Sequence, residues 1–590
     1  MSSNTPFTPA TTLLAATCLA ALALPVGAAA QAAPTPRNTR QAYLSAFDIE
    51  ANASGRAFFV SESDQGGTDL NGDGDTNDVV VRVLPAGSGP IVGPALAVDS
   101  FESLQMVADR VVLVVQEFGQ GGVDLNGDGD TSDLVLHLLD ASTGQVANLG
   151  RVYVHGGIRL TETSLFLHVS ELEEGLDVNG DGDRGDYVLE RLDLASGVVQ
   201  TIPLALDIGV QLVPQLVDGD VVVVLADEAH QGQDLNGDGD LGDAVPFVLE
   251  ASTGTLTNLG YSLSLPGIFT MPVAGGGRVA FLLSESVAGA DLNGDGDLGD
   301  GVAQLLDAAS GVKTSTGLAV SHPMLLRLEG DTLALGVSEA NQGGTDLNAD
   351  GDAQDAVLYL VDAATSGVVP SGLALERVVD LERGLVAFAV GEAGQGAQDL
   401  NGDGDAQDQV LHLLDLAGGA PVNLGLALPA KALGQVRATS GRLTGFLVDE
   451  AGQGGLDLDG DGDAVDEVWF VHDRLLGVTT NLRLAWSPQA LHPYVHAGPD
   501  FVLVAAGELA TGGRDLTGDG DTTDLALMLY SASASVPTRL GTALSNGYWG
   551  FGSVDGRRLV IGLPEAANGG RDLNGDGDTL DRVAHVVDVP

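Results

Sequence analysis

The chain has 590 residues, of which 44% are hydrophobic and only 4% aromatic, and it contains 83 glycines. Its formal net charge is −57, from 82 Asp and Glu residues against 25 Lys and Arg residues. So apolar a composition excludes an intrinsically disordered chain, and so acidic a balance excludes nucleic acid as a partner, because phosphate binding needs a basic face.

An export signal is predicted over residues 1–32. Apolar residues fill positions 13–33, and the small residues of VGAAAQAA permit cleavage after Ala30 or Ala32. The segment before this run has no Lys or Arg, so a retained membrane anchor stays as the alternative. The only cysteine, Cys18, lies within the signal, so we expect no disulfide in the mature chain. No later stretch is apolar enough to span a bilayer, and we expect the mature protein to be secreted, periplasmic or at the cell surface.

An acidic decamer, first seen as DLNGDGDTND, recurs ten times after the signal. The copies follow one another every 53 to 58 residues. Recurrence at such a period is typical of a solenoid, a propeller or an array. We therefore expect residues 45–590 to form one ten-repeat array, with residues 33–44 as an N-terminal segment ahead of it.

Around each decamer the sequence predicts a meander of four strands, which residues 103–150 illustrate. The first strand ends in a tight turn (ADR), and the second is the apolar run VVLVVQE, as expected of a strand buried on both faces. The acidic loop follows, then a third strand (LVLHLLD), a second turn (ASTG) and a short fourth strand ending in NLG. A repeated four-stranded meander is typical of a β-propeller blade.

The unit resembles the TolB-like and WD40-like propeller repeats, particularly from the third strand through the D-x-x-[ST]-G turn to NLG. Over residues 45–590 the resemblance implies an all-β fold, a β-propeller of ten four-stranded meander repeats of about 56 residues. Ten blades exceed the usual four to eight, so one wide ring and two smaller rings both stay open. The last repeat ends at its third strand, so a strand from residues 33–44 would complete that blade and cover its edge.

The decamer has the oxygen donors of a calcium site. Its pattern is Asp, Leu, Asn, Gly, Asp, Gly, Asp, x, x, Asp, which places oxygen-bearing side chains at positions 1, 3, 5, 7 and 10. Ca²⁺ takes six to eight oxygen ligands, and glycine at position 6 permits a sharp turn between them. Since the loop has no His or Cys, zinc is not expected. One copy alone is equally compatible with a plain acidic turn, but ten copies that keep oxygen donors favour calcium.

The first half of the decamer resembles the D-x-[DN]-x-D-G calcium loops of EF-hand, dockerin, thrombospondin type 3 and FG-GAP repeats. The resemblance stops at the closing ligand. An EF-hand has Glu at position 12, where the first copy has Val80, and an FG-GAP loop has its last aspartate at position 9 rather than 10.

A glutamate ends the second strand six or seven residues before every copy. Because the second and third strands pair, we expect this glutamate to face the aspartate at position 10 across the base of the loop. For the glutamate and for the aspartate at position 7, direct contact with the ion and a role in orienting its ligands are both open.

About ten Ca²⁺ sites are therefore expected, and each has six candidate residues. The glutamates are Glu62, Glu117, Glu171, Glu228, Glu285, Glu339, Glu392, Glu450, Glu508 and Glu565. Position 1 is Asp69, Asp124, Asp177, Asp234, Asp291, Asp346, Asp399, Asp457, Asp515 and Asp572. Position 3 is Asn71, Asn126, Asn179, Asn236, Asn293, Asn348, Asn401, Asp459, Thr517 and Asn574. Position 5 is Asp73, Asp128, Asp181, Asp238, Asp295, Asp350, Asp403, Asp461, Asp519 and Asp576. Position 7 is Asp75, Asp130, Asp183, Asp240, Asp297, Asp352, Asp405, Asp463, Asp521 and Asp578. Position 10 is Asp78, Asp133, Asp186, Asp243, Asp300, Asp355, Asp408, Asp466, Asp524 and Asp581.

The sequence predicts no enzyme. His137, His412 and His585 share one position of the third strand, which other copies fill with different residues, and the remaining histidines share no setting. No G-x-S-x-G, H-E-x-x-H or Walker motif is present. We expect an exported calcium-binding propeller that serves as a binding or structural module, its loops on one rim, with a protein or a glycan at the rim or the channel. The alternative is a calcium-dependent hydrolase or lyase acting on an extracellular polymer, with residues 486–496 (WSPQALHPYVH) as the nearest non-repeated segment.

Overall fold

The computed structural model describes residues 34, 36–42, 49–52, 54–85, 90–100, 104–154, 157–175, 177–206, 216–262, 272–320, 326–382, 384–430, 442–486, 495–498, 500–533, 536–544 and 557–589. Residues 34–590 form one compact unit. The predicted export signal lies outside the described residues. None of the helices in the described ranges is long and apolar enough to cross a membrane.

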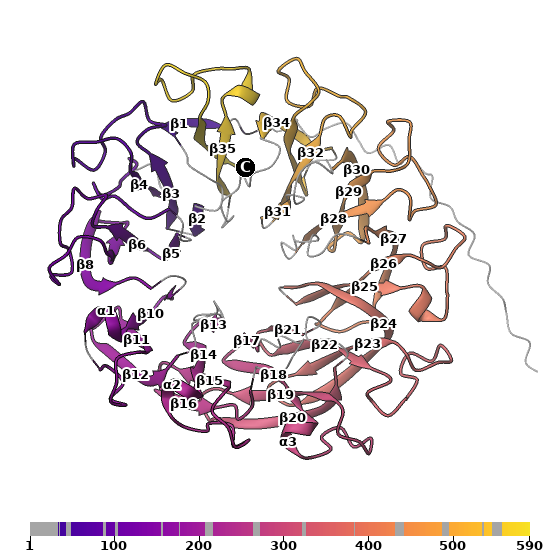
Figure 1. The fold of residues 1–590 in the computed structure, drawn as a ribbon. Coiled ribbons are helices and arrows are strands. Elements are labelled where there is room, and N and C mark those ends of the chain that lie inside the picture. The colour runs from indigo at the N-terminus through magenta and orange to yellow at the C-terminus, as the bar shows by residue number, and fades with distance from the viewer. Residues whose placement is uncertain are drawn as a thin grey trace, which may run out of the picture. The chain divides into compact units, whose positions relative to one another are not determined.

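The described chain is built from antiparallel strands, with a few one-turn helices (Figure 1), and all strands except β1 pair with their neighbours in chain order. We call the strands around each successive acidic decamer units 1 to 10, and the decamers loops 1 to 10. Units 1 to 3 contain β2 (Ile49–Asn52), β3 (Gly55–Ser61) and β4 (Val79–Pro85); β5 (Gln105–Val107), β6 (Arg110–Gln116), β7 (Leu134–Asp140) and β8 (Gln145–Val152); and β9 (Ile158–Leu160), β10 (Ser164–Ser170), β11 (Tyr187–Asp193) and β12 (Val199–Ala205). Units 4 and 5 contain β13 (Leu216–Asp218), β14 (Val221–Asp227), β15 (Ala244–Glu250) and β16 (Thr255–Asn258); and β17 (Val273–Gly275), β18 (Arg278–Ser284), β19 (Gly301–Asp307) and β20 (Val312–Ala319).

Units 6 and 7 form one seven-stranded sheet because they share a long strand, β24 (Gly367–Glu382). Its other strands are β21 (Arg327–Glu329), β22 (Thr332–Ser338), β23 (Ala356–Asp362), β25 (Leu385–Gly391), β26 (Gln409–Asp415) and β27 (Val422–Leu428). Units 8 to 10 contain β28 (Leu443–Asp449), β29 (Glu467–Asp473) and β30 (Val478–Ala485); β31 (Val495–Ala497), β32 (Phe501–Gly507), β33 (Leu525–Ser531) and β34 (Thr538–Leu544); and β35 (Arg558–Pro564) and β36 (Arg582–Asp588). The one-turn helices are α1 (Glu171–Glu174), α2 (Glu228–Gln231), α3 (Glu285–Ala288), η3 (Ala393–Gln395) and η4 (Ala566–Asn568).

The predicted four-stranded meander is present in units 2 to 7 and 9, whereas units 1 and 8 have three strands within the described residues. Four of the apolar second strands, β3, β10, β25 and β32, are buried along their whole length, and others such as β6 are buried along their centre. Their burial confirms the expectation of a strand covered on both faces.

Hydrophobic clusters between consecutive units explain this double burial. Phe59 of unit 1 and Leu113 of unit 2 belong to one cluster, and similar clusters join each later unit to the next. A further cluster joins Phe58 and Val60 of unit 1 to Val560 and Val586 of unit 10. Each fully buried apolar side chain stabilises the fold by roughly 1.5–3 kcal/mol, so the contacts between units hold the array together.

The sequence predicts that the fourth strand ends at NLG, which is correct for β16, whose last residue is Asn258, and wrong for unit 2. β8 continues to Val152, and its pairing with β7 shifts register between Val135 and His137. The Oδ1 atom of Asn148 accepts a hydrogen bond from the Gly150 amide at 2.7 Å, and Gly150 has φ 61°. NLG is therefore a β-bulge, where glycine takes a left-handed backbone conformation and the strand resumes after it.

The N-terminal strand β1 (Arg37–Ala42) pairs with β36, so the indigo start of the chain lies beside its yellow end (Figure 1). The Nδ2 atom of Asn38 donates to the Leu573 carbonyl at 2.7 Å, just as Asn148 donates to the Leu125 carbonyl at 2.7 Å. Arg40 has φ 60° and its amide donates to Asn38 Oδ1 at 2.6 Å. β1 thus repeats the bulge of the other fourth strands from the opposite terminus.

Candidate calcium loops

The side chains of each acidic loop hold its backbone in a series of short turns. In loop 1 the carboxylate of Asp69 accepts hydrogen bonds from the Gly72 amide at 2.5 Å and the Gly74 amide at 3.2 Å. Asn71 Oδ1 accepts from the Asp73 amide at 3.1 Å, and Asp73 Oδ1 from the Asp75 amide at 3.0 Å. The same bonds recur in loops 2 and 7. The loop backbone is thereby folded by hydrogen bonds to its own side chains.

The glutamate before each loop lies at its base, opposite the aspartate at position 10. The Glu392 amide donates to the Asp408 carbonyl at 3.0 Å, and the glutamate side chain is fully buried. Its Oε1 accepts from the amides of Leu400 at 2.5 Å and Asn401 at 3.3 Å, and its Oε2 accepts from the Asp408 amide at 3.1 Å. The geometry therefore gives this carboxylate a part in shaping the loop, by binding the backbone amides at both of its ends.

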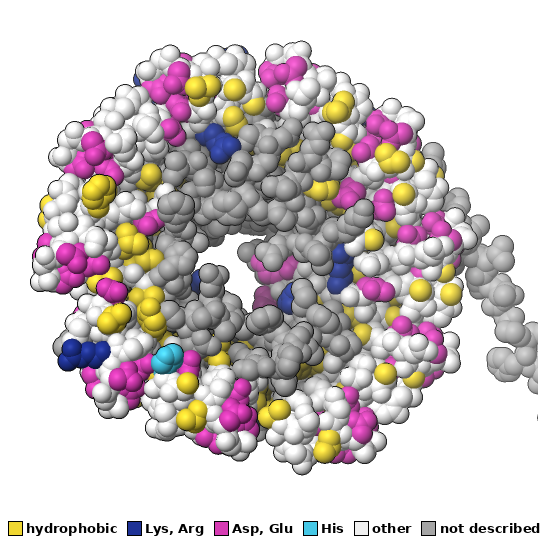
Figure 2. Space-filling view, viewed as in Figure 1, with side chains coloured by type: hydrophobic (Ala, Val, Ile, Leu, Met, Phe, Trp, Pro, Cys, Tyr) yellow, Lys and Arg dark blue, Asp and Glu magenta, His cyan; other side chains and the backbone are white. Residues whose placement is uncertain are grey.

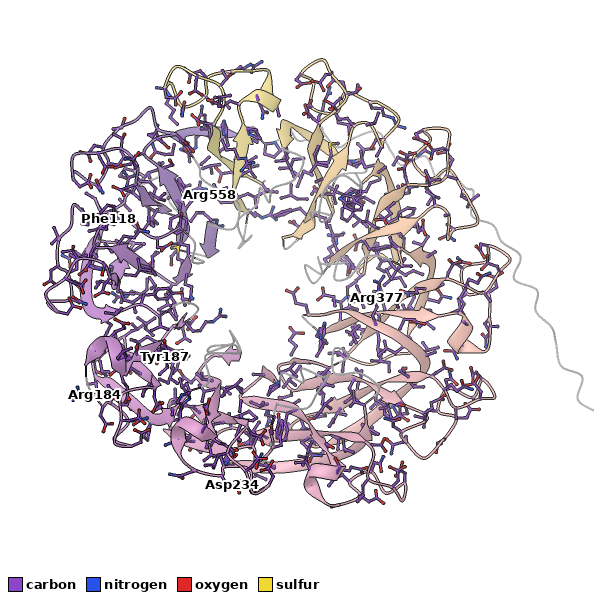
Figure 3. The ribbon with its side chains drawn as sticks, in the orientation of Figure 1. Phe118, Arg184, Tyr187, Asp234, Arg377 and Arg558 are labelled. Carbon is purple, nitrogen blue, oxygen red and sulfur yellow. The ribbon has the colours of Figure 1, made fainter. Side chains whose placement is uncertain are left out.

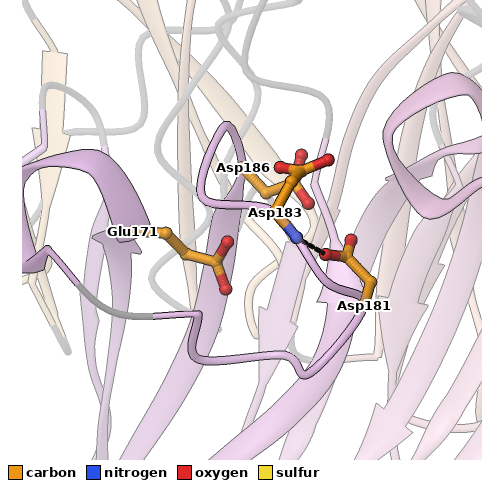
Figure 4. A group of neighbouring side chains, drawn as sticks. All are labelled: Glu171, Asp181, Asp183 and Asp186. Carbon is orange, nitrogen blue, oxygen red and sulfur yellow. Dashed lines mark hydrogen bonds between the residues drawn. The ribbon is translucent and has the colours of Figure 1, made fainter.

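Carboxylate oxygens of the predicted site residues lie close together. In loop 3, Glu171, Asp181, Asp183 and Asp186 offer oxygen atoms that all lie within 4.8 Å of one another (Figure 4). The Asp183 amide also donates to Asp181 Oδ1 at 3.1 Å. Loop 5 brings together the equivalent four residues, and loops 1, 2 and 4 bring together the glutamate with positions 7 and 10. The aspartate at position 1 is not part of these five groups, and in loop 1 its two oxygens accept hydrogen bonds from the amides of Gly72 and Gly74.

Several of these oxygens are buried without a hydrogen-bond partner in the described residues. They include Glu171 Oε2 and Asp186 Oδ1 in loop 3, Glu228 Oε2 in loop 4 and Asp459 Oδ2 in loop 8. The side chains of these four residues are at most 2% exposed. A buried charged oxygen without a partner is costly, and a cation among the carboxylates would remove that cost.

Burial raises the pKa of the aspartate at position 10 in loops 1 to 3 and 5 to 10. The pKa of Asp408 rises to about 6 and that of Asp466 to about 7, with repulsion from neighbouring carboxylates, chiefly Asp403 and Asp461, adding to the effect of burial. Like charges packed so closely oppose ionisation. A divalent cation would reverse this balance, since it favours the charged form of each carboxylate.

Acidic side chains lie in separate groups toward the outer edge of the face in Figure 2. Figure 3 shows that Arg184 and Asp234 project from acidic loops, whereas Arg377 and Arg558 lie away from them. Arg558 begins strand β35, whose other end leads to loop 10. Arg558 and loop 10 thus lie at opposite ends of β35.

Two sets of polar residues escaped the sequence analysis, although both recur with the repeats. Gln120 Oε1 accepts a hydrogen bond from the Ala97 amide of the preceding unit at 2.9 Å, and Gln453 Oε1 does the same for Ala427 at 3.0 Å. The asparagine of each NLG segment, and Asn481 of the equivalent NLR, donates to the carbonyl of the residue at position 2 of its own loop. The recurring GQGG and NLG strings were the signals for these contacts.

The remaining sequence candidates form no common site. The Nδ1 atoms of His137, His412 and His585 each lie 3.0–3.1 Å from the carbonyl two residues earlier, and burial lowers the pKa of all three. In the segment 486–496, Trp486 packs against the clusters that join units 8, 9 and 10. Residues 487–494 lie outside the described residues.

A pocket of about 490 Å³ lies between units 9 and 10, lined by residues that include Thr517, Leu540, Ala567, Arg571 and His585. Thr517 stands where most copies have asparagine, and its Oγ1 atom is buried without a hydrogen-bond partner.

No protein-family model matches the chain, and no curated protein does. Solved structures do match in fold. The tricorn protease is 10% identical with a TM-score of 0.26, covering 88% of this chain and 46% of its own. The β-propeller domain of the trilobed protease from Pyrococcus furiosus is 8% identical with a TM-score of 0.28, covering 59% and 89%. TolB from Acinetobacter baumannii is 12% identical with a TM-score of 0.20, covering 55% and 65%.

These matches include TolB and a β-propeller domain, in keeping with the all-β, propeller-like fold that the sequence resemblance implies. The chain spans less than half of the length of the tricorn protease. At such identities and TM-scores the matches assign no activity, substrate or partner to this chain.

The expectation that the chain is not an enzyme is contradicted by the same matches. The matching structures are mainly peptidases, among them a prolyl endopeptidase and the acylaminoacyl peptidase of Pyrococcus horikoshii. The missing motifs from which that expectation was drawn do not speak against catalysis, because residues that are distant in sequence can meet in a folded site. We therefore withdraw it.

Proposed function

We propose that the chain is a calcium-binding protein with about ten Ca²⁺ sites, one in each acidic loop. The ligands at each site come from positions 1, 3, 5, 7 and 10, together with the upstream glutamate as a ligand or as a support for the ligands. The observation that carries the proposal is loop 3, where four carboxylates lie within 4.8 Å of one another and two buried oxygens have no partner. Hard oxygen donors without His or Cys suit Ca²⁺.

Charge supports the same conclusion. Ten Ca²⁺ ions would change the formal net charge from −57 to −37. Each independent site contributes roughly 2.7 kcal/mol to stability when free calcium exceeds the Kd by about 100-fold, provided that the unfolded chain does not bind. Calcium is accordingly a folding ligand, and extracellular loops of this kind bind at about 10⁻⁴–10⁻³ M, which suits an exported protein.

We further propose that the ten units are the blades of a single closed propeller. The cluster that joins Phe58 to Val560 supports closure, because it places unit 10 against unit 1. The Nδ2 atom of Asn574 in loop 10 donates to the Asp64 carbonyl of unit 1 at 2.8 Å, which supports the same arrangement. In this proposal β1 is the fourth strand of the last blade and covers the edge of β36.

Such a propeller presents its acidic loops along one rim, where a protein or glycan partner would meet the bound ions. The acidic groups along the edge of the face in Figure 2 support this placement. The protein would act after export, where calcium is abundant.

The test is a calcium titration of the chelator-stripped mature protein, followed by thermal melting, with bound metal counted at saturation. We expect a large rise in melting temperature and about ten bound ions. A matched variant, Asp403→Asn with Asp405→Asn in loop 7, should lower the count by one. No rise in melting temperature, or only one or two bound ions, would show that most loops are acidic turns.

A further inference from the structure

The ten copies fall into two classes that differ by one residue. In units 3, 4 and 5 six residues separate the glutamate from position 1, and the glutamate begins one of the helices α1, α2 and α3. In the other units the separation is seven residues, and two consecutive residues of the turn have positive φ, as Gly454 and Gly455 do with 72° and 66°. The longer turn reaches the loop of the preceding unit.

Loop 7 and unit 8 show how this reach is used. The Nδ2 atom of Asn401 donates to the Gly452 carbonyl at 2.7 Å. A Cβ atom on Gly454 would lie 3.1 Å from the Cβ atom of Asp403, so the turn packs directly on position 5 of loop 7. Two predicted ligands of loop 7 therefore contact the turn of the next unit.

The same turn belongs to loop 8. Gly452 is two residues after Glu450, whose Oε1 accepts from the Leu458 amide at 2.6 Å and whose Oε2 accepts from the Asp466 amide at 3.1 Å. Loop 8 also contains Asp459, which is 1% exposed and has an unpartnered Oδ2 atom. A displacement of the turn would therefore change the shape of loop 8, because the buried carboxylate of Glu450 connects the two.

The bond from position 3 to the next unit follows the spacing. It is present from Asn71, Asn293, Asn348, Asn401 and Asn574 to the carbonyls of Gly119, Asn341, Gly394, Gly452 and Asp64. Where the next unit has the short spacing, Asn126, Asn179 and Asn236 donate only within their own loops among the described residues. Loops 8 and 9 have Asp459 and Thr517 instead of asparagine at position 3. In loop 8 the Arg514 guanidinium of the next unit donates to the Asp459 carbonyl at 2.9 Å. In loop 9 the pocket beside Thr517 lies where the bond to the next unit would be.

We propose that the position 3 asparagine is a positioning residue that couples its calcium site to the next one, so that sites 5 to 8 and sites 10, 1 and 2 fill as two coupled runs. The inference depends on the proposed calcium binding. A cation at the Oδ1 atom draws electron density from the amide and makes its N–H a better donor to the next unit. By linkage, an ordered turn in that unit strengthens binding in the first loop equally. Sites 3 and 4 fill independently.

The first test compares Asn401→Asp with Asn236→Asp in the full mature chain. Both variants keep an oxygen at position 3, as the natural Asp459 does, and both add one charge, but only Asn401→Asp removes a donor to the next unit. Calcium alone is the probe, with bound ions counted by equilibrium dialysis over a range of free calcium. We expect Asn401→Asp to weaken two sites by about fivefold or more, and Asn236→Asp to weaken one at most.

A second pair of variants changes the turn of unit 8 instead of loop 7. Gly454→Ala places a methyl group against Asp403, whereas Gly455→Ala meets no atom within 4 Å, and both positions have positive φ. We expect Gly454→Ala to weaken calcium binding at one additional site, site 7, that Gly455→Ala leaves unaffected. The sequence of loop 7 is unchanged in both variants. Equal effects within each pair would overturn the coupling while leaving the calcium sites intact. A wild-type chain that binds no calcium would overturn the proposed function and the coupling together.

Discussion

Substitution of Glu392 tests whether this glutamate shapes the loop through backbone hydrogen bonds or binds the ion directly. The side chain is fully buried and accepts hydrogen bonds from three backbone amides. Glu392→Ala leaves all three donors unpaired, at roughly 1–3 kcal/mol each, so the free energy of unfolding should fall by at least about 3 kcal/mol. Glu392→Gln keeps one acceptor but turns an NH₂ group toward the Asp408 amide, which should cost roughly 1–3 kcal/mol.

The assay is urea unfolding of both variants and the wild type at two saturating calcium concentrations about tenfold apart. A framing glutamate gives Glu392→Gln the same deficit at both concentrations, because the number of ions released on unfolding is unchanged. Loss of a ligand, and with it of one ion, would widen the deficit by about 1.4 kcal/mol per tenfold rise in calcium. That widening, or a deficit under about 1 kcal/mol for Glu392→Ala, would show that Glu392 does not frame the loop.

Three further perturbations test the fold. Trp469→Ala should cost roughly 3–5 kcal/mol by calorimetry, because the indole is fully buried and donates to the next unit at 2.8 Å, whereas Leu475→Ala, at a side chain 75% exposed, should change stability by about 0.5 kcal/mol or less. Deleting residues 37–42 should bare the edge of β36, so light scattering should detect self-association that the full mature chain does not show. Burial lowers the pKa of His168 to about 3, so below about pH 6.5 the unfolded chain binds one more proton at this residue than the folded chain does. As the pH falls, the wild type should therefore lose up to roughly 1.4 kcal/mol of stability per pH unit relative to His168→Leu. A parallel pH dependence in the two proteins would contradict the burial of an uncharged imidazole.

Short-range sequence patterns predicted most of the strands and loops. The run VVLVVQE predicted a strand covered on both faces, and β6 is buried along its centre because units pack on either side of it. The order of glutamate, acidic loop and third strand placed Glu117 opposite Asp133, and the two pair through a backbone hydrogen bond of 3.0 Å. Periodicity and strand order are local properties, so sequence reasoning recovers them.

Contacts between units were less accessible to sequence reasoning. NLG was expected to end a strand, but the strand continues beyond Gly150 because Asn148 holds a bulge. The difference between six and seven residues before position 1 was visible in the chain. Its consequence depends on where Gly452 lies relative to Asn401, which are far apart in sequence and meet only when two units pack.

The strands, the acidic loops and the oxygen donors that make calcium the expected ion could be predicted from the chain alone, because side-chain chemistry and periodicity are present in each repeat. The folded molecule was needed to show which donors lie close together, which loops contact the next unit, and that β1 pairs with β36. The reason is that a carboxylate acquires its role from the groups that surround it. A buried Glu392 facing three amides frames the loop, and a solvated one would not.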